Sequence, residues 1–441
     1  MDQQTTLPKA APDDAGKATD KEESWLSKLG PGLITGAADD DPSGIATYSQ
    51  AGAQFGFGLL WMAFLTYPLM VGIQEVSARI GRISGRGLAS NIRRHYPPWL
   101  LYTMVGLLLI ANTINIAADM AAMGDALRLI AGGKPQLYAL GFGVLSMLLQ
   151  VFIPYTRYVS ILKWLTLALL AYFATAMAVK VPWLQVVKST FVPHMQWKTE
   201  YLTTMVALFG TTISPYLFFW QAAQEVEELN ADPEAQPLKK APEQVRPQLR
   251  RIKVDTAIGM GFSNLVAWAI MLTTAVTLNA HGILDIQSSA QAASALRPIA
   301  GDLAFFLFSM GIIGTGLLAI PVLAGSAAYA MAGAFNWRSS LELEPSAARK
   351  FYGIIVAATL GGALIGFLPL DPIKALYWSA VVNGVIAVPI MVVMMLLTTH
   401  KGVMGGVKMT RRVRLLGWAC TAVMATAAIA MFATMAVTGV S

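Results

Sequence analysis

Residues 29–56 read LGPGLITGAADDDPSGIATYSQAGAQFG, and this stretch decides the fold. Apolar sequence lies on both sides of three consecutive aspartates, Asp39, Asp40 and Asp41, which are followed by Pro42 and Gly44. Proline removes a backbone donor and disfavours helical geometry in the residue before it. Each half is too short to cross a bilayer, for which a helix needs about 20 residues. The stretch therefore predicts one membrane helix broken at its middle, with freed carbonyls and carboxylates facing one small volume.

The composition of the whole chain is that of an integral membrane protein. Of its 441 residues, 55% are hydrophobic and only 13% are charged, whereas an ordinary soluble domain has about 25% charged residues. The mean hydropathy is +0.55. This composition excludes a soluble enzyme of one or two domains, and the single cysteine, Cys420, excludes a disulfide framework. The net charge of +7 does not indicate nucleic-acid binding, because the charges lie between apolar segments.

Eleven apolar segments follow a polar stretch, residues 1–24, that we expect to be a disordered cytoplasmic tail. We therefore expect an all-α membrane protein with 11 transmembrane helices. The predicted segments are 30–54, 57–78, 99–131, 137–155, 158–180, 201–225, 254–279, 300–334, 347–368, 372–398 and 413–438. If the chain crosses at each segment, 24 of the 32 Lys and Arg residues fall on the side of the tail and seven on the other side. The positive-inside rule then predicts a cytoplasmic N-terminus and an external C-terminus.

The sixth segment has a break that matches the first. Residues 208–228 read LFGTTISPYLFFWQAAQEVEE, with Thr211, Ser214 and Pro215 near the middle of the segment. Proline kinks in membrane helices are often only structural. Here, however, the two breaks fall in the first helices of two five-helix halves, and such matched interruptions indicate a transport site at the bilayer midplane. The sequence therefore predicts a secondary transporter with two inverted repeats, not an enzyme.

This organisation divides the chain into four parts. We expect the first repeat at 25–180 (helices 1–5) and the second at 201–398 (helices 6–10), which contains a cytoplasmic loop at 226–253. An extra eleventh helix follows at 411–441.

The residues at the first break predict a cationic solute. Asp41 beside unwound carbonyls offers hard oxygen ligands, which suit a cation, and an acidic group there would repel a substrate carboxylate. No obvious aromatic cage accompanies Asp41, so an inorganic divalent ion is favoured over an organic cation.

From about residue 28 onward the chain resembles the Nramp family of divalent metal transporters, which share the leucine-transporter fold. The resemblance is sharpest in residues 30–56, where GPG, DP, AT and AGAQFG stand in the family's order. It implies that Asp41 is the metal-binding aspartate of the family's DPGN motif, whose asparagine ligand is Gly44 here. It also implies that the family's methionine ligand is replaced by Ser214 and that the family's carbonyl ligand belongs to Thr211.

Two further positions follow from the same resemblance. Asp119 matches the family's proton-relay aspartate, while the second acid of that motif is Ala122, so standard proton coupling is in doubt. Asn383 in the tenth segment is the one strong polar side chain near the expected site, and we include it as a candidate ligand.

The departures from the family motif predict which ion is carried. Loss of a thioether removes a preference for soft metals, and the smaller residues enlarge an oxygen-lined site that suits hydrated Mg²⁺. We therefore expect a carrier of Mg²⁺ and then Mn²⁺ that resembles the Nramp-related magnesium transporters, with weak or no proton coupling. The expected setting is the lipid bilayer of a bacterial inner (plasma) membrane, with no cofactor and no obligate protein partner.

Three alternatives remain open. The first is a proton-coupled Mn²⁺/Fe²⁺ importer of the ordinary Nramp type, and the second is a sodium-coupled organic-cation carrier. The third, an intramembrane aspartyl protease using Asp41 and Asp119, is disfavoured because neither residue has the GxGD-type context of such enzymes.

Overall fold

The computed structural model describes residues 31–153, 165–366, 368 and 371–439, and within these ranges all regular structure is helical. The expected tail at 1–24 lies outside the described residues, as does the start of the fifth predicted segment. Helices occupy all eleven predicted segments: α1 (Pro31–Asp39) with α2 (Pro42–Phe55), η2 (Gly56–Leu59) with α3 (Leu60–Ser84), α5 (Pro98–Ala131), α6 (Pro135–Phe152), η3 (Leu165–Leu169) with α8 (Leu170–Ala178), α10 (Thr199–Thr212) with α11 (Pro215–Ala231), α12 (Val245–Thr277), α15 (Ala304–Phe335), α16 (Arg349–Ile365), α17 (Pro372–Leu397) and α19 (Arg411–Thr438).

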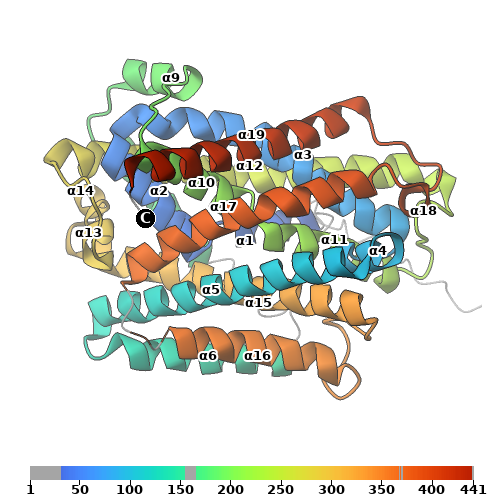
Figure 1. Ribbon diagram of the computed structural model, residues 1–441. Helices are drawn as coiled ribbons and strands as arrows, with labels where there is room; N and C mark the ends of the chain where they lie inside the picture. The colour runs from blue at the N-terminus through green and yellow to red at the C-terminus, as the bar shows by residue number, and fades with distance from the viewer. Residues whose placement is uncertain (1–30, 154–164, 367, 369–370, 440–441) are drawn as a thin grey trace, which may run out of the picture.

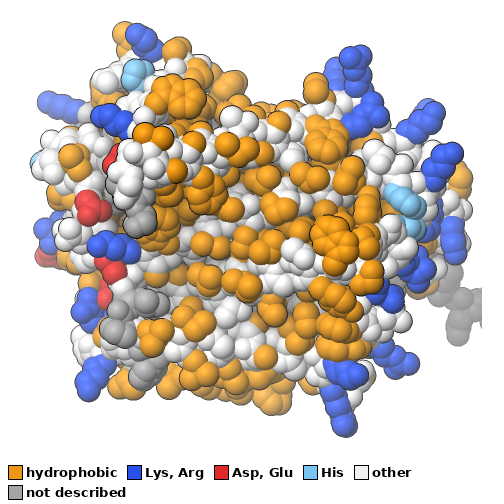
Figure 2. Space-filling model, viewed as in Figure 1, with side chains coloured by type: hydrophobic (Ala, Val, Ile, Leu, Met, Phe, Trp, Pro, Cys, Tyr) orange, Lys and Arg blue, Asp and Glu red, His pale blue; other side chains and the backbone are white. Residues whose placement is uncertain are grey.

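Short helices connect these segments at the two ends of the molecule. They are α4 (Leu88–His95), α9 (Trp183–Phe191), η4 (Pro242–Gln244), η5 (Asn279–His281), α13 (Ser289–Ser294), α14 (Arg297–Ala300), η6 (Gly301–Leu303) and α18 (Lys401–Met404). In Figure 1, α4 and α18 lie at one end of the bundle, and α9, α13 and α14 lie at the other. Figure 2 shows hydrophobic side chains across the middle and Lys and Arg gathered at both ends. Eight helical stretches in the described part of the chain are long and apolar enough to cross a bilayer.

The structure confirms both predicted breaks. α1 ends at Asp39 and α2 begins at Pro42, and α10 ends at Thr212 and α11 begins at Pro215. One connection is narrower than the sequence predicts: helices extend into the 226–253 loop from both sides, so only 232–244 separates α11 from α12. Proline marks each new start because it fits the first turn of a helix, where no backbone donor is needed.

The half-helix α1 packs along α12 in a constant register. Gly32 N donates to Asp255 Oδ2 at 2.6 Å. A Cβ at Gly36 would overlap the Gly259 backbone. In both pairs, Gly32 with Asp255 and Gly36 with Gly259, the residue numbers differ by the same amount. The two helices therefore run parallel and in direct contact. Small residues four apart allow membrane helices to approach this closely, and Gly32 and Gly36 provide that spacing.

A chain of polar bonds holds α11 against α3. Gln74 Nε2 donates to the Leu217 carbonyl at 2.8 Å, and Ser77 Oγ donates to the Phe218 carbonyl at 2.5 Å. A Cβ at Gly81 would overlap the backbone of Ala222. These contacts fix the direction in which α11 leaves the second break.

The contact between α1 and α12 yields a first prediction. Gly36→Ala places a methyl group against the Gly259 backbone, and such overpacking costs about 1–3 kcal/mol. We expect the purified variant in detergent to unfold at a lower temperature than the parent chain.

Gly106→Ala in α5 is the matched control, because a Cβ there meets nothing within 4 Å. Alanine is also the better helix former by about 1 kcal/mol. Equal melting temperatures for the two variants would contradict the close approach of α1 to α12.

Candidate metal-binding site

Asp41 begins the second half of the first broken helix and caps it with its own side chain. Its backbone is extended (φ −74°, ψ 171°), and Oδ1 accepts from Gly44 N at 2.8 Å and from Ser43 Oγ at 2.6 Å. Asn115 of α5 donates to the other oxygen, Oδ2, at 3.0 Å. A carboxylate at this place also meets the positive end of the helix dipole. The Asp41 side chain is only 2% exposed, and both of its oxygens are hydrogen-bonded within the protein.

Ser214 stands at the second break and stabilises a helix end instead of a helix start. Its Oγ donates to the Gly210 carbonyl at 2.6 Å and lies 3.1 Å from the Thr211 carbonyl. The hydroxyl proton is therefore used by the end of α10, while the oxygen lone pairs remain available to a cation.

Thr211 and Gly44 bring the two breaks together. Thr211 Oγ1 lies 3.4 Å from Ser43 Oγ. A Cβ at Gly44 would lie 3.2 Å from Thr211 Oγ1 and 3.6 Å from Asp41 Oδ1. The expected residues Asp41, Gly44 and Thr211 therefore lie next to one another, and a Cβ at Gly44 would also lie only 3.1 Å from the Tyr48 ring, so the region beside Gly44 is closely packed.

Asp119 and Asn383 are also buried polar residues, as expected for residues of a site. Asp119 lies one turn beyond Asn115 on α5 and interacts electrostatically with Asp41, and no described residue donates a hydrogen bond to either of its carboxylate oxygens. Asn383 belongs to α17, which packs against α2 and α10, and neither polar atom of its side chain has a partner among the described residues. Buried polar atoms without partners are uncommon and call for an explanation.

Asn115 is a site residue that sequence reasoning missed, although the sequence contained a signal for it. Asn112, Asn115 and Asp119 are spaced by three and four residues, so they share one face of α5. Asn112 Nδ2 reaches the Leu323 carbonyl of α15 at 2.8 Å, and Asn115 reaches Asp41. Tyr216 was also missed as a contact, and its hydroxyl donates to the Ala38 carbonyl at the end of α1 at 3.1 Å.

The assembled groups are oxygen donors of mixed charge. No three His, Cys, Asp or Glu side chains converge on a metal site among the described residues, so Asp41 would be joined by neutral hydroxyl, amide and carbonyl oxygens. One or two carboxylates with retained waters is the usual environment of Mg²⁺, and Mn²⁺ accepts the same oxygen ligands. The arrangement is chemically suited to a hard divalent ion that keeps part of its water shell.

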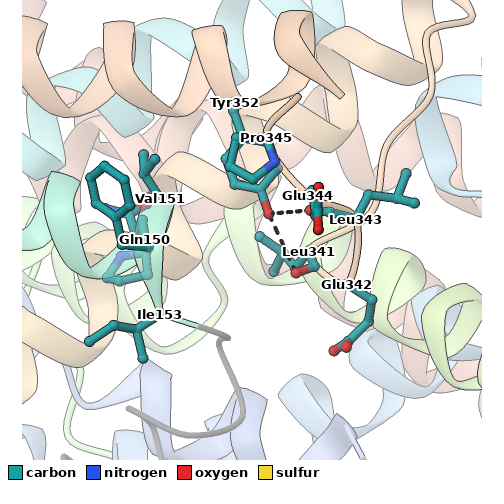
Figure 3. A pocket seen from close by; sticks show the side chains of 11 residues that line it. Gln150, Val151, Ile153, Leu341, Glu342, Leu343, Glu344, Pro345 and Tyr352 are labelled. Carbon is teal, nitrogen blue, oxygen red and sulfur yellow. Dashed lines mark hydrogen bonds between the residues drawn. The ribbon is translucent and has the colours of Figure 1, made fainter. Parts of the chain in front are cut away.

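Two cavities lie away from these residues. One of about 290 Å³ at the end near α13 is lined by polar groups that include Gln50, Glu200 and Asp285, and by Tyr377. The Tyr377 hydroxyl lies 2.8 Å from Thr204 Oγ1. The other, of about 200 Å³, lies between the end of α6 and the 341–345 segment, where Tyr352 bonds the Leu343 carbonyl at 2.9 Å (Figure 3). Neither cavity is lined by any of the expected site residues.

Comparisons with known proteins identify the family. Residues 32–434 match the family model described as Nramp, natural resistance-associated macrophage protein-like. The chain is 26% identical over 399 residues to the divalent metal cation transporter MntH of Deinococcus radiodurans, covering 89% of this chain and 86% of that protein. It is also 26% identical over 409 residues to MntH of Klebsiella pneumoniae, covering 90% and 92%.

The fold is shared with solved structures. A crystal structure of an Eremococcus coleocola manganese transporter, in complex with an aromatic bis-isothiourea substituted compound, superposes with a TM-score of 0.71 at 18% identity. The match covers 93% of this chain and 88% of that one. The leucine-transporter-like architecture predicted from the sequence is thereby confirmed.

The bond from Asn115 to Asp41 yields a second prediction. Asn115→Ala leaves Asp41 Oδ2 buried without a donor, which costs about 1–3 kcal/mol. We expect a lower melting temperature in metal-free detergent solution. Saturating Mn²⁺ should narrow the difference, because a bound cation gives that oxygen a new partner.

Thr113→Ala is the control on the same helix, since Thr113 Oγ1 bonds only the Leu109 carbonyl of its own turn. Equal melting of the two variants without metal would rule out a role for Asn115 in holding Asp41.

Proposed function

The chain belongs to the Nramp family, and on that premise we propose that it moves divalent metal cations across the membrane by alternating access, Mg²⁺ first and Mn²⁺ second, with weak or no proton coupling. The single observation that carries this proposal is the contact between the two helix breaks, where Ser43 Oγ, which donates to Asp41, lies 3.4 Å from Thr211 Oγ1. Transport of a divalent metal cation is what the names of the MntH relatives state of those proteins.

Two features support Mg²⁺ as the preferred ion. A serine hydroxyl, not a thioether, stands at Ser214, and hard oxygen ligands favour hard ions. Gly44 has no side chain that could replace a water ligand of an ion beside Asp41, which suits an ion that releases its water reluctantly. The alternative, a proton-coupled Mn²⁺/Fe²⁺ importer, draws support from the similarity in fold to a manganese transporter.

Asp119 is the candidate residue for proton coupling. It is buried near Asp41 without a hydrogen bond to either oxygen, but Ala122 one turn further along α5 cannot accept a proton from it. A relay of two acids is therefore incomplete on this helix.

We further propose that the end carrying α4 and α18 faces the cytoplasm of a bacterial cell, so the N-terminus lies inside and the C-terminus outside. The excess of Lys and Arg in the connections at that end supports this orientation. In the proposed organisation, 25–180 and 201–398 form the two inverted repeats and 411–441 adds the eleventh helix.

Ion pairs close the proposed cytoplasmic end. Arg251 of α12 contacts Glu225 and Glu228 of α11, each at 2.7 Å, and Arg82 of α3 lies 3.8 Å from Glu228. Glu225 is fully buried. Breaking a buried pair by removing one partner costs about 3–5 kcal/mol. This network therefore ties α3, α11 and α12 together in the conformation described, and alternating access requires it to separate.

The transport proposal is tested with proteoliposomes that contain a pH-sensitive dye. We expect Mg²⁺ and Mn²⁺ to enter without internal acidification. Asp41→Ala should abolish both fluxes, because it removes the charged ligand and the cap of α2 together.

Asp302→Ala is the matched control, since Asp302 is exposed and makes no ion pair among the described residues. Entry of Mn²⁺ with acidification and without Mg²⁺ would favour the proton-coupled alternative. In that case Asp119→Asn would identify Asp119 as the coupling group by removing the pH signal.

The ion pairs at the proposed cytoplasmic end yield a further prediction. In a background where Cys420→Ala removes the only cysteine, Ala38→Cys places a thiol at a buried position on α1. We expect Arg251→Gln to raise the rate at which a membrane-impermeant maleimide labels this thiol from the cytoplasmic side several-fold, because α11 and α12 are released from each other.

Arg128→Gln is the control, because Arg128 pairs with Asp125 of its own helix near the opposite end. An unchanged labelling rate in the Arg251 variant would mean that the pairs do not hold the cytoplasmic side closed.

A further inference from the structure

Two more carboxylates lie beside Asp41, and the transport site described above does not use them. Asp39 ends α1, Asp40 lies in the break, and both side chains contact Ser263 of α12. We propose that Asp39, Asp40 and Ser263 form a second divalent-cation site next to Asp41. This inference rests on the proposed function in that the cation it takes is of the same class as the transported one.

Ser263 of α12 is shared by the carboxyl groups of Asp39 and Asp40. Its Oγ lies 2.5 Å from Asp39 Oδ2 and 3.0 Å from Asp40 Oδ1. A serine hydroxyl has one hydrogen and can donate it to only one of these oxygens. The hydroxyl therefore satisfies only one carboxylate by donation, and the second contact calls for either a bound cation or a proton shared with Ser263.

Asp39 also carries an oxygen with no partner. Its Oδ1 makes no hydrogen bond to any described residue, although the side chain is completely buried. Uncompensated buried charge is among the most costly arrangements in a protein, so the cluster is incomplete without a bound group.

No basic side chain supplies the missing charge. None of the ion pairs among the described residues includes Asp39, Asp40 or Asp41. Asp39 moreover stands at the C-terminus of α1, where the helix dipole is negative and repels a carboxylate. Asp41, in contrast, stands at a helix N-terminus and has donors on both oxygens. The electrostatic need for a cation is therefore greater at Asp39 and Asp40 than at Asp41.

The proposed second site exists only while α1 packs on α12. Asp39 and Asp40 come from α1 and the break, whereas Ser263 comes from α12. The Gly32 to Asp255 bond and the close approach of Gly36 hold the same two helices in register. A cation bound here therefore stabilises the conformation that is closed at the proposed cytoplasmic end, and movement of α1 away from α12 dismantles the site and releases the ion.

The test counts Mn²⁺ ions bound per chain in purified full-length protein, using electron paramagnetic resonance to measure the free ion. We expect two bound ions in the parent chain. Asp39→Asn combined with Asp40→Asn should remove one of them and keep the ion at Asp41. Asp41→Asn should remove the ion at Asp41. Ser263→Ala should weaken only the binding of the ion at Asp39 and Asp40, and the control Asp302→Asn should bind two ions like the parent chain.

Each outcome has a defined meaning, provided that size-exclusion profiles and melting temperatures show the variants to be folded. One ion in the parent chain, unchanged in the double variant, would overturn the second site and would mean that protons neutralise Asp39 and Asp40. Loss of all binding in the double variant would also overturn it, because the residues would then belong to a single site. Failure of the proposed function is distinct: it would appear as absent uptake in proteoliposomes while the stoichiometry stays at two.

Discussion

Inside a bilayer every backbone polar group must find its partner within the protein, and the two breaks are where this constraint is hardest to meet. At the first break, the Asp41 side chain accepts from the Gly44 amide, which has no partner within α2, and Ile45 N donates to the Asp41 carbonyl at 3.2 Å. At the second break, the Ser214 hydroxyl donates to the Gly210 carbonyl in the last turn of α10. The two residues thus cap opposite helix ends. Asp41 provides an acceptor at the start of α2, which a carboxylate can do, and Ser214 provides a donor at the end of α10, which requires a group such as a hydroxyl.

The parallel contact of α1 with α12 explains how three successive aspartates can be accommodated. Asp255 receives the amide of Gly32 at the positive end of α1, and Ser263, two turns later, faces Asp39 and Asp40 at its negative end. Gly36 and Gly259 lie between these contacts and bring the helix backbones together. A larger residue at Gly36 would move the carboxylates away from Ser263. The position of the charges is therefore set by glycines that themselves bind nothing.

Local sequence was enough to predict the breaks, because proline and glycine act on the backbone where they stand. Thr211 was named only through the family resemblance, as a carbonyl ligand, whereas the structure places its hydroxyl 3.4 Å from Ser43 Oγ. Asn115 was missed although its helical spacing from Asp119 was readable, because a polar face on a membrane helix does not reveal its partner. The roles of Ser263 and Asp255 could not be read at all: both depend on the register of two helices more than 200 residues apart in the chain.

In the described part of the chain, arginine side chains pair with the carboxylates at one end of the bundle but not with those at its centre. Glu225 and Glu228 at one end of the bundle are neutralised by Arg251, whereas none of the described ion pairs includes Asp39, Asp40, Asp41 or Asp119 at its centre. An arginine at the centre would compensate these carboxylates permanently and leave no reason for a cation to enter. Leaving that charge open makes the transported ion part of the folded structure while it is bound. Two adjacent sites would then repel each other's ions, which keeps each bound weakly enough to leave.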